Sequence, residues 1–150
     1  SAADALDYVA GYTVLNDISD RKYKPNPERK ERDRDGFFDW LHGKWHDGFC
    51  PIGPAIASAQ TLTNPNALAL DLSVNGEERQ KTNTDHMIYG VRDIIEFISR
   101  SVTLEPGDII ATGTTAGTGH ALGKLLREGD QLAATIEGIG TLNNHMVIES

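Results

Sequence analysis

Polar side chains gather at the end of a short apolar run near the start of the sequence. The stretch "GYTVLNDISDR" closes with Asn16, Asp17, Ser19 and Arg21 within six residues. Asn, Asp and Ser side chains hydrogen-bond to nearby backbone and end strands, so the cluster is predicted to form a turn. A carboxylate held at the end of a rigid strand can also bind a hard cation such as Mg²⁺, which prefers oxygen ligands. A single Asp supplies too few ligands for a metal site, so both interpretations of Asp17 stay open.

Lys44 is a second candidate because it stands among aromatic residues, in the stretch "DWLHGKWHDGF". Trp40, Trp45 and Phe49 all lie within five residues of it. An ammonium group beside aromatic side chains can pair with a carboxylate or with the negative charge of an enolate. A purely structural role is the alternative for this lysine.

The stretch "GTTAGTG" (residues 113–119) is rich in glycine and threonine. It matches neither G-x-x-x-x-G-K-[ST] nor G-x-G-x-x-G, so a nucleotide site is not favoured. Glycine allows backbone N–H groups to approach a ligand closely, and the hydroxyl of Thr112 or Thr114 can add a donor. The stretch therefore predicts a loop that can contact a carboxylate.

The histidines and the single cysteine match no recognised catalytic or zinc pattern, since H-E-x-x-H, paired cysteines and G-x-S-x-G are all absent. His42 and His46 would share one face of a helix and could then bind zinc. Gly43 and Gly48 argue against a helix there, which favours ordinary surface or pocket roles for both histidines. Cys50 has no base near it in sequence and is interpreted as a packed residue.

The elements expected to position these residues are mainly strands, with no regular βαβ alternation. This pattern predicts a mainly β or α+β fold with a rolled, barrel-like mixed sheet. Alternation and turn signals, including Asn75-Gly76, predict the strands. The expected strands are residues 12–15, 67–74, 77–82 and 140–149, a short buried strand after the Pro106-Gly107 turn, and an alternating strand after the Gly129-Asp130 turn in "LREGDQLAATIEG".

One amphipathic helix is predicted near residues 87–102, where apolar side chains recur at helical spacing after a possible cap at Thr84-Asp85. Residues 2–9 are predicted to be the last turns of another helix.

Residues 20–36 contain charges of both signs and two prolines, so they are predicted to form a loop. Residues 37–57 are dense in aromatics, Gly and Pro and predict irregular backbone against the core.

The composition is that of a soluble globular protein, because 39% of the 150 residues are hydrophobic and 24% are charged. The length fits a single domain. The net charge of −8 disfavours nucleic acid as a partner, since phosphate binding depends on Lys and Arg. No apolar stretch is long enough to cross a membrane, and the start does not read as a signal peptide. A single cysteine fits a reducing compartment, so a cytoplasmic location is expected.

Four stretches together resemble the fumarylacetoacetate hydrolase superfamily, in the same order and over nearly the whole chain. They are "GYTVLNDISDR", "GKWHDGFCPIGPAI", "LSVNGEERQKTNTDHMIYGVRDIIEFISRSVTLEPGDIIATGT" and "LREGDQLAATIEGIGTLNN". The resemblance implies a mixed β-roll fold, usually dimeric, with a small-molecule 2-oxo or dienoic acid as substrate. It also implies a divalent cation that chelates the 2-oxo acid, with Mg²⁺ first and Mn²⁺ or Ca²⁺ as alternatives.

The same resemblance implies roles for five residues. Asp17 matches the aspartate that ligates the metal, and Arg21 matches an arginine of the substrate pocket. Lys44 matches a catalytic lysine beside metal and substrate. Thr114 matches the threonine of the loop that binds the substrate carboxylate. Lys24 stands at a substrate-binding position where many members carry Gln.

One departure from the family pattern leaves the activity open. In the family, a Glu-x-Glu metal motif and a His-Glu pair that activates water lie upstream of the stretch matching Gly11. Residues 1–10 of this sequence contain neither motif. The sequence is therefore expected to be the C-terminal two thirds of a catalytic domain. The first expectation is carbon-carbon bond hydrolysis of an acylpyruvate or fumarylpyruvate type. The alternatives are an isomerase or decarboxylase of aromatic catabolism, acting on a 2-hydroxy-dienedioate or oxaloacetate, or a non-catalytic protein of the same fold.

Overall fold

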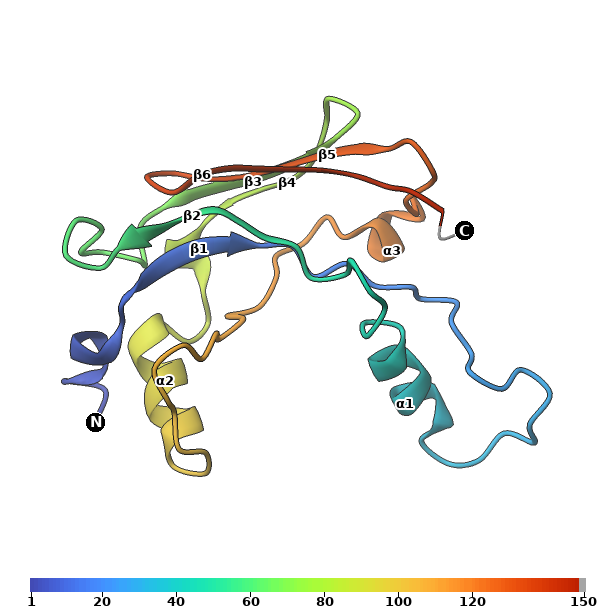
Figure 1. The fold of residues 1–150 in the computed structure, drawn as a ribbon, viewed down its shortest axis with the longest axis horizontal. Helices are drawn as coiled ribbons and strands as arrows, with labels where there is room; N and C mark the ends of the chain where they lie inside the picture. Colours follow the sequence, from blue (N-terminus) through green and yellow to red (C-terminus); the bar gives the residue numbers. More distant parts are fainter. Residues whose placement is uncertain (149–150) are drawn as a thin grey trace. The chain divides into compact units, whose positions relative to one another are not determined.

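The computed structural model describes residues 1–148 and has the mixed, mainly β character predicted from the sequence (Figure 1). Its strands are β1 (Gly11–Leu15), β2 (Ile52–Ser58), β3 (Ala69–Val74), β4 (Glu77–Asn83), β5 (Gln131–Ile136) and β6 (Gly140–His145). Its helices are α1 (Asp35–His42), α2 (Val91–Ser99) and α3 (Gly119–Leu122), with 3₁₀ turns η1 (Ala5–Tyr8) and η2 (Thr84–His86). The chain divides into two compact units, residues 15–52 and the remainder, and each is described by itself.

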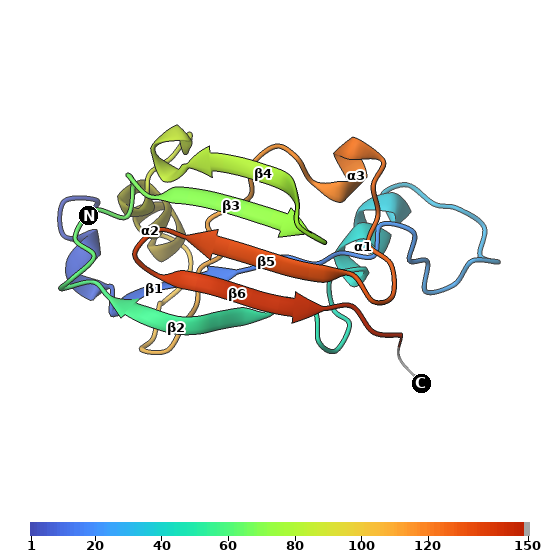
Figure 2. The same cartoon turned by 90° about the horizontal axis from the view of Figure 1, so that it is seen from above.

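The larger unit is built on a four-stranded antiparallel sheet with the order β4-β3-β5-β6 (Figure 2). Asn75 and Gly76 have φ values of 53° and 78° and form the tight β3–β4 turn that their types predict. Across the sheet, Leu72 pairs with Ala134, which in turn pairs with Leu142. These three side chains form an apolar row on one face of the sheet.

A second layer, made of β1 and β2, packs on that row. Val14 of β1 is buried against Ala134 and Leu142, and Figures 1 and 2 both show β1 and β2 crossing one face of the larger sheet. The two strands lie close together at Gly11, where an added Cβ would stand 2.4 Å from the Ala57 carbonyl oxygen. This contact excludes a larger side chain at Gly11, because no Cβ is tolerated so near a backbone oxygen.

Helix α2 confirms the predicted amphipathic helix but is shorter than expected. Gly90 is extended and precedes the first turn, and its N–H donates to the Asp93 carboxylate at 3.0 Å. The cap predicted at Thr84-Asp85 is wrong, because these residues form the 3₁₀ turn η2, in which the Asn83 side chain accepts from the Asp85 N–H. Residues 5–8 likewise form a single 3₁₀ turn rather than the end of an α-helix.

Three other local expectations also need correction. Residues 108–112 form no strand, and Ile109 is exposed, so the buried strand predicted there is wrong. Residues 37–57, expected to be irregular, contain most of α1 and β2. The last strand ends at His145, and residue 149 of the predicted range lies outside the described residues.

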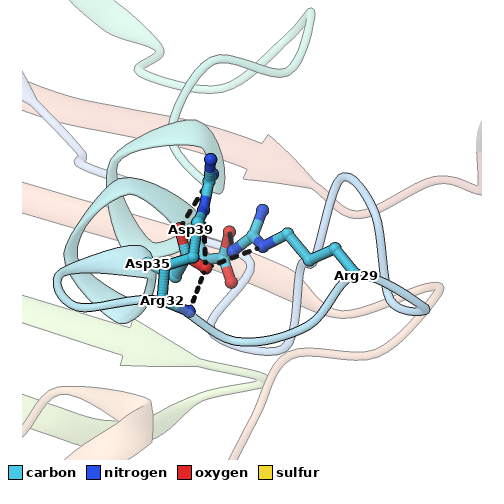
Figure 3. Close-up of polar contacts among 4 residues, drawn as sticks. All are labelled: Arg29, Arg32, Asp35 and Asp39. Atoms are coloured by element: carbon cyan, nitrogen blue, oxygen red, sulfur yellow. Dashed lines mark hydrogen bonds and ion pairs between the residues drawn. The ribbon is translucent and has the colours of Figure 1, made fainter.

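The smaller unit contains the predicted loop of residues 20–36. The end of this loop is fixed by an ion-pair cluster of Arg29, Arg32, Asp35 and Asp39 (Figure 3). Asp35 is only 4% exposed. It accepts from the Arg32 N–H at 2.7 Å, from Arg32 Nη2 at 3.2 Å and from Arg29 Nε at 3.1 Å. Arg29 Nη2 also donates to Asp39 at 2.7 Å. A carboxylate this shielded needs such partners, so the cluster anchors the loop to α1.

The same contacts affect the acidity of Asp35. The backbone N–H of Arg32, followed by its guanidinium, holds the pKa of the Asp35 carboxyl below its ordinary value. A lowered pKa in the folded chain means that ionised Asp35 stabilises the fold above the unfolded pKa of about 3.9. That stabilisation is lost as the pH falls through the folded-state pKa.

Truncation of the apolar row should destabilise the larger unit. Leu142→Ala removes buried methyl groups that contact Val14 and leaves a cavity, so we expect the free energy of unfolding to fall by about 2–4 kcal/mol. Urea denaturation of the whole chain measures the change. Ile56→Ala is the matched control, since Ile56 is 72% exposed and should change stability by less than about 0.5 kcal/mol. Equal losses in both variants would contradict this core assignment.

Asp35→Asn should reduce the acid sensitivity of the fold. The amide cannot ionise, so the variant is expected to be less stable than the wild type at pH 7 and to lose less further stability as the pH falls below about 4. Urea midpoints measured at both pH values test this. Asp33→Asn is the control because the Asp33 side chain is 98% exposed. An unchanged pH dependence in Asp35→Asn would show that another carboxylate dominates acid unfolding.

Candidate functional site

Lys44 is held by the polar cluster that follows β1. Its Nζ donates to Asp17 Oδ2 in a close ion pair and to Ser19 Oγ at 2.9 Å. The same Nζ lies 5.2 Å from the centroid of the Trp40 ring, within the range of a cation–π interaction. The Lys44 side chain is 17% exposed and the Asp17 side chain is 50% exposed. The structure therefore joins the two candidates into one charged group with the carboxylate open to solvent.

Backbone contacts set this geometry. The chain leaves β1 at Asn16, whose N–H donates to the Pro51 carbonyl at 3.1 Å. The Asp20 N–H donates to the Gly43 carbonyl at 2.8 Å. A Cβ at Gly43 would stand 2.2 Å from the Asp20 carbonyl oxygen, so only glycine allows this approach. Gly43 follows α1 directly, and the contact therefore places the next residue, Lys44, beside the turn.

Arg21 and Lys24 lie exposed on the loop that follows this turn. Between them, the Lys22 N–H donates to the Asp20 carboxylate at 2.9 Å. The Tyr23 ring packs edge-on against His46, with 4.6 Å between ring centroids. These contacts anchor the loop between two solvent-facing cations, and neither cation has an ion-pair partner among residues 1–148.

Thr114 belongs to the larger unit, on the glycine-rich loop predicted from the sequence. Gln80 of β4 is 9% exposed, and its Nε2 lies 3.2 Å from Thr114 Oγ1, 2.9 Å from the Thr115 carbonyl oxygen and 3.3 Å from that of Ala116. Gly117 has a φ of 97°, and an added Cβ would lie 2.0 Å from the Arg79 carbonyl oxygen. The loop therefore lies directly against β4.

Sequence reasoning missed Gln80, because the polar run "EERQKT" indicates no buried face. It also interpreted Ser19 only as a turn residue and not as a partner of Lys44.

The histidines do not form the zinc pair considered from their spacing. His42 is the last residue of α1, and its ring packs on Trp45, whereas His46 lies beyond the helix and packs on Tyr23 and Phe49. Across residues 1–148, no group of three or more His, Cys, Asp or Glu side chains is arranged to hold a metal ion. Cys50 is exposed, so its interpretation as a packed residue is wrong.

The fit of a divalent cation can be judged from the donors present. Asp17 offers the oxygen ligand that a hard cation prefers, and its carboxylate is accessible. Its charge is balanced here by Lys44, and residues 1–148 contain no full ligand set. The described residues therefore supply one ligand of such a site and do not complete it.

Among the described residues, no helix combines the length and apolar composition that a membrane span requires.

Comparison with known proteins places these residues in a family. The family model "Fumarylacetoacetate (FAA) hydrolase C-terminal" matches residues 1–147. A curated relative, the mitochondrial oxaloacetate tautomerase Fahd2a of Rattus norvegicus, is 38% identical over 97% of this chain and 44% of its own length. The chain spans about half the length of the curated relatives it matches.

Solved structures agree with this placement. The 2-hydroxyhepta-2,4-diene-1,7-dioate isomerase of Mycobacterium marinum is 41% identical, with a TM-score of 0.80 over 97% of this chain and 50% of its own. The fumarylpyruvate hydrolase of Pseudomonas aeruginosa, solved with Mn²⁺ and pyruvate, is 30% identical, with a TM-score of 0.83 over 99% of this chain and 59% of its own. This chain belongs to the fumarylacetoacetate hydrolase family, as the four sequence stretches predicted.

Proposed function

We propose that the protein is a divalent-cation-dependent enzyme that hydrolyses a carbon-carbon bond in an acylpyruvate-like or fumarylpyruvate-like 2-oxo acid. The observation that carries the proposal is the shielded ammonium of Lys44 held between Asp17 and Ser19. Support comes from the fumarylpyruvate hydrolase relative, whose structure contains Mn²⁺ and pyruvate. Mg²⁺ is the cation we propose for this protein, because it is a hard ion that suits a carboxylate ligand.

Asp17 is proposed as one ligand of the cation, because its carboxylate is accessible at the end of a rigid strand. When bound, such a cation withdraws charge from the two oxygens of a 2-oxo carboxylate and eases formation of an enolate. Asp17 would supply one oxygen ligand, and the described residues do not complete the ligand set.

Lys44 is proposed as the catalytic residue that stabilises the enolate. An ammonium has three N–H donors, and Asp17 and Ser19 accept two of them. The third is available to a substrate oxygen that gains negative charge during the reaction. The Lys44 side chain is mostly shielded from water, which strengthens its electrostatic effect. Arg21, Lys24 and Thr114 are proposed to bind the substrate, as their positions in the family resemblance imply.

An isomerase or tautomerase is the second candidate activity. It is supported by the names of an isomerase that is 41% identical and a tautomerase that is 38% identical. Both activities require a stabilised enolate or enol, and only hydrolysis also requires an activated water. Decarboxylation of an oxaloacetate-like acid uses the same enolate. Assays with fumarylpyruvate, oxaloacetate and a 2-hydroxy-dienedioate separate these reactions by their products, and no turnover of any of them would favour a non-catalytic protein.

The remaining expectations concern the setting of the enzyme. We propose a homodimer that binds a small-molecule acid. A cytoplasmic location stays a prediction. The tautomerase Fahd2a of Rattus norvegicus is described by its name as mitochondrial.

Asp17→Asn should abolish cation-dependent turnover. The amide keeps the size of the side chain but loses the charge that attracts a cation, so activity should fall at least about a hundredfold and Mn²⁺ binding should weaken. Steady-state kinetics and the electron paramagnetic resonance of bound Mn²⁺ measure the two effects. Asp47→Asn is the control because Asp47 is exposed in the same unit. Unchanged turnover in Asp17→Asn would refute the proposed role.

Lys44→Met should lower kcat and leave cation binding intact. Loss of one electrostatic donor to an oxyanion costs about 2.7–4 kcal/mol of transition-state stabilisation, so kcat should fall about a hundredfold to a thousandfold. Mn²⁺ binding is the second measurement, and it should be at least as tight because Asp17 loses its competing cation. Lys30→Met, at an exposed position, is the control. A normal kcat in Lys44→Met would exclude Lys44 as the catalytic residue.

A further inference from the structure

Gln80 is a buried polar residue in the middle of β4, paired with Leu72 of β3. Its side-chain nitrogen faces the glycine-rich loop rather than solvent. We propose that Gln80 is a positioning residue that fixes the direction of the Thr114 hydroxyl, so that this hydroxyl donates its proton to the carboxylate of a 2-oxo acid. The inference rests on the proposed substrate-binding role of Thr114. It adds that Gln80, from β4, orients the Thr114 hydroxyl for that role.

The first step is the orientation of the Gln80 amide. The atom that faces the loop lies 2.9 Å from the Thr115 carbonyl oxygen and 3.3 Å from the Ala116 carbonyl oxygen. Carbonyl oxygens only accept hydrogen bonds, so this atom must be the NH₂ nitrogen. The reversed amide would place its oxygen against two other oxygens. The two carbonyls therefore decide the orientation independently of Thr114.

The second step concerns Thr114 itself. The Gln80 NH₂ group has two protons and no acceptor capacity, so the three acceptors share two N–H groups, and Thr114 Oγ1 at 3.2 Å can only be an acceptor in this contact. A hydroxyl has one proton to donate, and it cannot donate that proton back to Gln80. Thr114 is exposed, so its proton is available to a group outside the protein. An anionic carboxylate, which has acceptor oxygens only, is the ligand class that this arrangement favours.

The third step is the rigidity of the loop. Gly117 lies directly against the Arg79 carbonyl, and the two N–H groups of Gln80 are shared among acceptors on three successive residues of the loop. The Thr114 hydroxyl is thus held on a fixed backbone before any ligand arrives. Preorganised donors bind an anion more strongly than mobile donors, because the cost of ordering them has already been met in folding.

A double-mutant cycle separates this role from simple support of the loop. The probe is pyruvate with Mn²⁺, and the measured quantity is its Kd for the wild type, Thr114→Val, Gln80→Met and the double variant. A hydrogen bond to a charged group is worth a factor of about ten or more, so Thr114→Val should weaken binding at least about tenfold. Gln80→Met should weaken it about threefold to tenfold. If Gln80 acts through the Thr114 hydroxyl, the double variant should bind no worse than Thr114→Val.

The controls distinguish failure of this inference from failure of the proposed function. Thr114→Ser keeps the hydroxyl and should bind pyruvate nearly as the wild type does. If Thr114→Val binds normally, the proposed role of Thr114 is wrong, and the inference falls with it. If Thr114→Val binds weakly but the Gln80 effect is undiminished in its background, Gln80 only supports the loop and the inference alone is wrong.

A measurement on the unmodified chain tests the amide orientation even if Gln80→Met does not fold. Nuclear magnetic resonance should show the Gln80 side-chain NH₂ protons protected from exchange with water, because they are bonded to the loop carbonyls. Rapid exchange of both protons would overturn the orientation and the inference.

Discussion

A shielded polar side chain must meet hydrogen-bonding partners, and this constraint determines how the loops of this protein are held. Asp35, Lys44 and Gln80 are each largely shielded from water. Each replaces its hydrogen bonds to water by hydrogen bonds to groups on a neighbouring segment. Asp35 orders the end of the charged loop, Lys44 orders the turn after β1, and Gln80 orders the glycine-rich loop. Replacement of any one by an apolar residue removes the hydrogen bonds that join its segment to the neighbouring one, which is why polar contacts specify these loops so strongly.

Elements whose formation depends on local signals could be predicted from the sequence. The Asn75-Gly76 turn and its two strands, the helix through Val91, and the end of β1 at the polar cluster follow from residue type and spacing alone. The strand expected after Pro106-Gly107 did not form, although its apolar residues are typical of one. A strand needs a partner as well as a favourable sequence, and no propensity rule supplies one.

The candidate site was predictable in its residue types but not in its contacts. Asp17 and Lys44 are 27 positions apart, and their ion pair depends on the close approach of Gly43 to the backbone of Asp20. Periodicity carries no information about such an approach. Gln80 could not be identified for a similar reason, since only the folded loop shows that its amide is covered. The family resemblance supplied roles for residues whose geometry the sequence could not show.

The direction of a hydrogen bond can matter as much as its length in this fold. Asp17 and Ser19 accept from Lys44, which leaves one ammonium proton for a new acceptor. Gln80 donates to Thr114, which leaves the hydroxyl proton for a new acceptor. Under the proposed function, both arrangements hold a donor for the negative charge of a substrate. Such donors suit any reaction in which a 2-oxo acid becomes an enolate, so these two contacts do not by themselves distinguish a hydrolase from an isomerase or a tautomerase. The choice among these reactions must depend on how water or a proton reaches the enolate carbon, and that step is chemically separate from these two donors.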